Sequence, residues 1–100
     1  MEFNPNNKIV RLCLQGMQSE EQGKTDEASQ LFAQAWDDAT YDFEKFISAH
    51  FIARYQRNVS DKLHWFETNL QFALKINDDS IQSALPSLYS NIAKCHWPRL

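Results

Sequence analysis

The feature that most constrains this chain is the spacing of its apolar residues, which return every three or four positions over most of its length. Ile9, Val10, Cys13 and Met17 form one such stripe, and similar stripes follow further along. This spacing is that of one face of an α-helix. The sequence holds only two glycines and three prolines, so few residues interrupt helices or build tight hairpins. The pattern predicts a single all-α domain.

Breaks in the apolar pattern divide the chain into about five helices joined by short links. We expect Gly23 in the left-handed position that ends the first helix, and Thr25, Thr40 and Ser60 as caps of the next three. Links this short force neighbouring helices to run antiparallel, so the chain is expected to form stacked helix hairpins. Pro86 lies in the last apolar stretch, where it either opens the last helix or kinks it.

Six residues of the first hairpin have the spacing of a repeat unit, with a large residue, a small one, a turn glycine and then an aromatic between two alanines: Leu12, Gly16, Gly23, Ala28, Phe32 and Ala35. A shift of 34 residues carries Ile9 to Phe43, where a second apolar set begins. The chain therefore resembles the tetratricopeptide repeat (TPR) superfamily. It is also similar to small bacterial TPR-like proteins that are sometimes labelled rRNA adenine methyltransferases.

The resemblance implies a short right-handed solenoid of two and a half repeats. The TPR-like domain would cover residues 8–97, with repeats over 8–39 and 41–76 and a half repeat over 80–97. Residues 1–7 are expected to be disordered or extended, and residues 98–100 to form a tail.

A TPR-like stack would have a concave groove lined by the first helix of each repeat, and the implied partner is a peptide or helix of another protein. The residues placed at this groove are Cys13, Met17, Glu20, Ile47, Phe51, Arg54, Tyr55, Ser90 and Lys94. Arg54 and Tyr55 are the strongest anchors, because both residue types are enriched in binding hot spots. An alternative interpretation assigns Val10, Ile47 and Phe51 to the core.

The sequence predicts no enzyme. A methyltransferase of the usual kind needs a strand followed by a glycine-rich turn, and neither glycine follows a strand pattern. The histidines and cysteines, which are His50, His64, His96, Cys13 and Cys95, match no known spacing of metal ligands. No catalytic residue, cofactor or metal is predicted. The exposed last helix is a second surface at which a partner protein could bind. The competing functions are a self-associating structural or regulatory protein and, as the label of the similar proteins suggests, a nucleic-acid-related methyltransferase-type enzyme. Self-association would form a homodimer through an uncovered outer face of the last helix, made of Leu85, Leu88 and Ile92.

The net charge of −3 gives no attraction for nucleic acid, and no apolar run approaches the roughly 18 residues that cross a bilayer. Residues 1–50 carry four basic and nine acidic side chains, and residues 51–100 carry six and four, an asymmetry that suits either head-to-tail contact between copies or a basic partner. Cys13 and Cys95 are far apart and no signal peptide is recognised, which favours a reducing, cytoplasmic location.

Overall fold

The computed structural model describes residues 6–76 and 78–96. Within these ranges the chain forms five helices of at least 12 residues and one helix of a single turn. They are α1 (Lys8–Glu21), α2 (Thr25–Asp38), α3 (Asp42–Arg54), α4 (Val59–Lys75), α5 (Asp79–Gln82) and α6 (Leu85–His96). The predicted all-α fold of about five helices is confirmed. The predicted tail, residues 98–100, lies outside the described residues.

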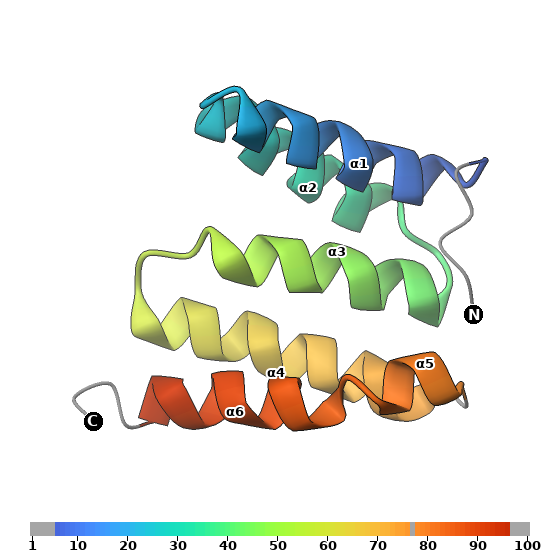
Figure 1. The fold of residues 1–100 in the computed structure, drawn as a ribbon, viewed down its shortest axis with the longest axis vertical. Helices are drawn as coiled ribbons and strands as arrows, with labels where there is room; N and C mark the ends of the chain where they lie inside the picture. The colour runs from blue at the N-terminus through green and yellow to red at the C-terminus, as the bar shows by residue number, and fades with distance from the viewer. Residues whose placement is uncertain (1–5, 77, 97–100) are drawn as a thin grey trace.

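Each of the first four helices packs against the next one along the chain. α1 packs on α2, α2 on α3 and α3 on α4, while α1 also contacts α3 and α6 lies against α4. Figure 1 shows this order as a stack from α1 at the top to α6 at the bottom, with α2 partly behind α1. Among the helices of residues 6–76 and 78–96, none combines the length and the apolar character that crossing a membrane requires.

The turn between α1 and α2 is closed by Gly23, as predicted. Its φ is +78°, a region that residues with a side chain rarely adopt. The N–H of Gly23 donates to the carbonyl of Glu20 at 3.0 Å, and the N–H of Lys24 donates to the carbonyl of Ser19 at 2.8 Å. These two bonds satisfy carbonyls at the end of α1 in the Schellman arrangement and turn the chain directly into α2.

The predicted caps at Thr25, Thr40 and Ser60 are wrong. Asn58 caps α4, because its side-chain oxygen accepts the N–H of Ser60 at 2.7 Å. Thr25 is the first residue of α2 and not its cap. Thr40 precedes Tyr41, the residue at the cap position of α3. Asparagine and serine are equally good capping residues, so composition alone does not choose between neighbours.

Pro86 opens the last helix and does not kink it. α6 begins at Leu85, so Pro86 lies in its first turn, where a missing N–H costs no helical hydrogen bond. The N–H of Leu88 then donates to the carbonyl of Ala84 at 3.1 Å, which starts the helix normally. The chain before it forms the separate turn α5 instead of a kinked extension of α6.

Phe32 is at the centre of the core, with a side chain that is fully buried. Its ring stacks on that of Phe51, with centroids 4.8 Å apart and planes 8° apart, and lies 5.6 Å from the ring of Tyr55. A Cβ added at Gly16 would lie 2.7 Å from Cζ of Phe32 and closer still to Cε1. The glycine is therefore the residue that lets α1 approach this ring.

The start of α1 is tied to the start of α3 by Glu44. One carboxylate oxygen of Glu44 accepts the backbone N–H groups of Thr40 at 2.9 Å and Tyr41 at 3.2 Å. The other accepts the side-chain amide of Asn7 at 2.9 Å. The amide oxygen of Asn7 in turn accepts the N–H of Ile9 at 2.8 Å and so caps α1. Asn7, the last residue of the segment predicted to be disordered or extended, has an extended backbone and is held by these bonds. Residues 1–5 of that segment lie outside the described residues.

Asp38 is an acidic residue at the C-terminal end of α2, where the helix dipole disfavours negative charge. Contacts with Gln34 and Lys8 explain how this charge is tolerated. The Asp38 carboxylate accepts a hydrogen bond from Gln34 at 2.8 Å and pairs with Lys8 of α1 at 3.0 Å. The hydrogen bond from Gln34, followed by that from Lys8, lowers the pKa of Asp38 below its ordinary value. The charge is thus compensated by the neighbouring helix.

Candidate functional site

Three of the nine predicted groove residues belong to the core. Cys13 is 1% exposed, Ile47 is 3% exposed and Phe51 is 8% exposed. They are covered because α1 and α3 are in contact with each other and both pack on α2, where the ring of Phe32 lies. The expectation that these three side chains line an open groove is therefore wrong, and the alternative that Ile47 and Phe51, together with Val10, are core residues is confirmed.

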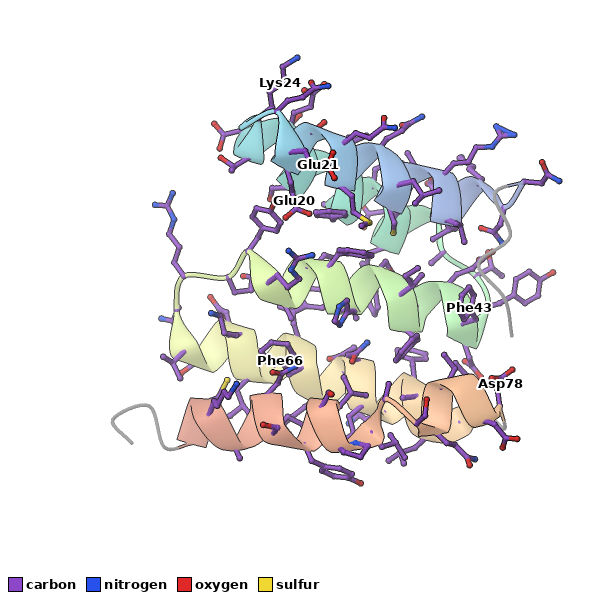
Figure 2. The ribbon with its side chains drawn as sticks, viewed as in Figure 1. Glu20, Glu21, Lys24, Phe43, Phe66 and Asp78 are labelled. Carbon is purple, nitrogen blue, oxygen red and sulfur yellow. The ribbon has the colours of Figure 1, made fainter. Side chains whose placement is uncertain are left out.

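Glu20, Arg54 and Tyr55 come together where α1 and α3 end. Nη2 of Arg54 lies 3.1 Å from Oε2 of Glu20, and the guanidinium carbon lies 5.6 Å from the centre of the Phe51 ring. Figure 2 shows Glu20 between α1 and α3, whereas Lys24 points away from the body of the molecule. The two predicted anchors are thus adjacent, but both are engaged with Glu20.

The contact with Glu20 should be measurable in the pKa of the Tyr55 hydroxyl. Burial, together with a hydrogen bond to the Glu20 carboxylate and its charge, raises the pKa of Tyr55 to about 12. Absorbance at alkaline pH should therefore show a tyrosine that ionises well above the ordinary value of 10, and Tyr55→Phe should remove that late step. Because the folded pKa is raised, the associated stability is present below pH 10 and is lost as the pH rises toward 12. A late step that survives in Tyr55→Phe would contradict this assignment.

The remaining three predicted residues lie on the surface but are not brought together. Met17 is 39% exposed and shares a face of α1 with Leu14, which is also exposed. Ser90 and Lys94 are exposed on α6, which packs against α4. Since α3 lies between α1 and α6 (Figure 1), these residues do not form a site with Met17.

A hollow of about 330 Å³ lies between α2, α3 and α4. α2 supplies one face of the hollow, with residues spaced by three or four positions. α3 and the turn after it form the floor, and α4 closes the other side. The residues that line it are Ser29, Phe32, Ala33, Trp36, Asp37, Ile52, Tyr55, Gln56 and Trp65. Of the nine predicted groove residues, Tyr55 is the one that lines this hollow.

Two tryptophans form much of the wall of this hollow. The rings of Trp36 and Trp65 meet edge to face, with centroids 5.0 Å apart and planes at 90°. The ring of Phe72 also packs on that of Trp36, with centroids 6.0 Å apart. The ammonium group of Lys45 lies 4.1 Å from the centre of the Trp36 ring and donates a hydrogen bond to the carbonyl of Trp36 at 2.8 Å. The wall is therefore preorganised by packing on several sides.

The sequence gives no direct sign of this hollow, because aromatic residues at helical spacing usually belong to the core. Trp36 and Trp65 are only partly buried and pack at the edge of the core. The sequence does indicate that each tryptophan stands on the second helix of a hairpin. How the two rings meet across α2 and α4 depends on how α3 places those helices.

The face of α6 that was predicted to mediate self-association is largely covered by the rest of the protein. Leu88 is 3% exposed, whereas Leu85 and Ile92 are half-buried. α6 packs on α4, which accounts for this burial. The exposed large apolar side chain on α6 is Tyr89. An uncovered stripe of Leu85, Leu88 and Ile92 is therefore wrong.

The titratable groups near the core have the properties of packed residues. Burial raises the pKa of the Cys13 thiol to about 12, so this cysteine stays protonated at neutral pH. Burial, followed by the charge of Arg54, lowers the pKa of His50, whose ring lies 5.3 Å from that of Phe51. In the part of the chain that the structure describes, no three His, Cys, Asp or Glu side chains are placed to share a metal ion.

The chain was also compared with known proteins. No family model matches it, and neither a curated protein nor a solved structure shows significant similarity to it.

Proposed function

We propose that this chain is a TPR-like protein-interaction domain that binds a peptide or helix of a partner protein and catalyses no reaction. The observation that carries the proposal is the aromatic-walled hollow of about 330 Å³ between α2, α3 and α4. Its volume falls at the lower end of the range for ligand pockets and suits one large side chain. Interfaces concentrate their binding energy where one anchor side chain fills a pocket and displaces the water from it.

The TPR-like part of the proposal is supported by how the hairpins pack. α1 pairs with α2 and α3 with α4, while α2 and α1 both contact α3, as stacked helix hairpins require. The small residue of the repeat pattern, Gly16, lies against the aromatic of the same pattern, Phe32. In the second repeat the residues that match Phe32 and Ala35, after a connection longer by four residues, are Leu70 and Ala73, and both pack in or against the core.

The hollow is a better anchor site than the face formed by α1 and α3. On that face the apolar residues Cys13, Ile47 and Phe51 are buried, and the charged residues Glu20 and Arg54 pair with each other. A partner would have to break that ion pair, whereas the hollow offers apolar surface that is already open.

Ala33 provides the test, because it lines the hollow and is exposed. Peptides selected from a phage-displayed library against the full chain are expected to bind wild type and to lose at least about tenfold in affinity to Ala33→Gln, since the longer side chain fills the hollow. Ala93→Gln makes the same change on the exposed surface of α6 and should leave binding unchanged. Affinity is measured by calorimetry, with circular dichroism to confirm that both variants are folded.

Two results would overturn the proposal. One is a library that yields no peptide that binds the folded chain. The other is a set of peptides that bind Ala33→Gln as tightly as wild type, which would place the interaction outside the hollow.

A further inference from the structure

The hollow between α2, α3 and α4 has one charged residue among those that line it, Asp37. Asp37 is exposed, and it makes no ion pair with the residues that the structure describes. Its neighbour Asp38 differs, because it already pairs with Lys8 and accepts a hydrogen bond from Gln34. The carboxylate at the hollow is therefore available to a ligand.

The aromatic walls suit the same kind of ligand as this carboxylate. Trp36, Tyr55 and Trp65 line the hollow with rings that are only partly buried, and the face of an aromatic ring attracts a cation, tryptophan most strongly. An alkyl chain would also bury its apolar surface against these rings. A ligand with an alkyl stem and a positive end therefore satisfies both parts of the hollow.

We propose that the residue of the partner protein that enters this hollow is a lysine or an arginine. Its methylene groups contact Trp36 and Trp65, and its charge lies at Asp37. This inference rests on the proposed function and names the chemistry of the anchor that the hollow receives.

The charge distribution around the hollow agrees with a basic partner. Residues 1–50, which include α2, carry nine acidic and four basic side chains. The hollow is also at the C-terminal part of α2, where the helix dipole favours a cation. Lys45, the cation nearest to Trp36, is held by the carbonyl of that residue and does not line the hollow.

The test uses two small probes that differ in charge. n-Butylammonium copies the lysine side chain, and n-butanol is its neutral counterpart. Titrated into the ¹⁵N-labelled full chain, n-butylammonium is expected to shift the indole N–H signals of Trp36 and Trp65 saturably and to bind at least about threefold more tightly than n-butanol, the preference that a solvent-exposed charge pair gives. Asp37→Asn should abolish this preference. Asp26→Asn, which removes a charge at the other end of α2, should keep it.

Each outcome bears on a different proposal. Equal binding of the two probes to wild type overturns the cationic anchor and leaves the hollow as an apolar binding site. A preference that survives in Asp37→Asn overturns the placement of the ligand's charge at Asp37. Peptides that depend on Ala33 but carry no essential lysine or arginine also overturn the cationic anchor. If neither probe shifts the indole signals and no peptide depends on Ala33, the proposed function itself fails.

Discussion

Replacing Phe32 with alanine is expected to lower the free energy of unfolding by about 4 kcal/mol, the cost of emptying a fully buried aromatic site. Phe32 has no exposed surface, and its ring contacts Phe51 and Tyr55 across two helices. The change therefore removes packing between α2 and α3 as well as contacts with α1. Urea unfolding followed by circular dichroism measures the loss, and an unchanged midpoint would contradict the placement of Phe32 at the centre of the core.

The contact between Phe32 and Gly16 can be isolated with a second substitution. In wild type, Gly16→Ala is expected to destabilise by about 1 to 2 kcal/mol, because the added methyl group meets the Phe32 ring. In the Phe32→Ala background that obstacle is gone, and the same change should stabilise by up to about 1 kcal/mol through helix propensity alone. The sign of the Gly16 effect thus reports whether the ring is present. The same sign in both backgrounds would mean that Gly16 is not placed against Phe32.

The elements of this fold were predictable because their information is local. The repeat of apolar residues marks each long helix, Gly23 marks the left-handed turn, and the spacing of Gly16 and Phe32 anticipates a close contact between α1 and α2. Capping was less predictable, since Asn58 and Ser60 differ little in their ability to accept a backbone N–H.

The site was harder to predict because it depends on distances between helices. Trp36 and Trp65 look like core residues in sequence, and only the placement of α3 between α2 and α4 leaves them partly open. The reverse applies to Cys13 and Ile47, which look like groove residues until the contact between α1 and α3 buries them. In both cases the exposure of a side chain is decided by tertiary packing, which periodicity does not encode.

Glu44 is the second residue whose replacement should have a large effect. The side chain is 8% exposed, and its carboxylate accepts three hydrogen bonds, two from the backbone before α3 and one from Asn7. Burial acts to raise the pKa of Glu44, but these hydrogen bonds outweigh it, so the pKa is lowered from its ordinary value of 4.5. The amide of Asn7 cannot turn around to meet a new donor, because its oxygen already caps α1.

Glu44→Gln is therefore expected to lower the free energy of unfolding by about 2 kcal/mol at neutral pH, since it removes the charge from these bonds and sets two amide donors against each other. The lowered pKa gives a stability contribution that is present above pH 4.5 and is lost as the pH falls through the folded pKa. The difference between wild type and Glu44→Gln in urea unfolding should consequently shrink in that acidic range. Glu67→Gln, a matched change at an exposed position of α4, should show neither effect. If Glu44→Gln lowers the free energy of unfolding by the same amount at every pH, then the packing of this side chain, and not the charge of its carboxylate, holds α1 to α3.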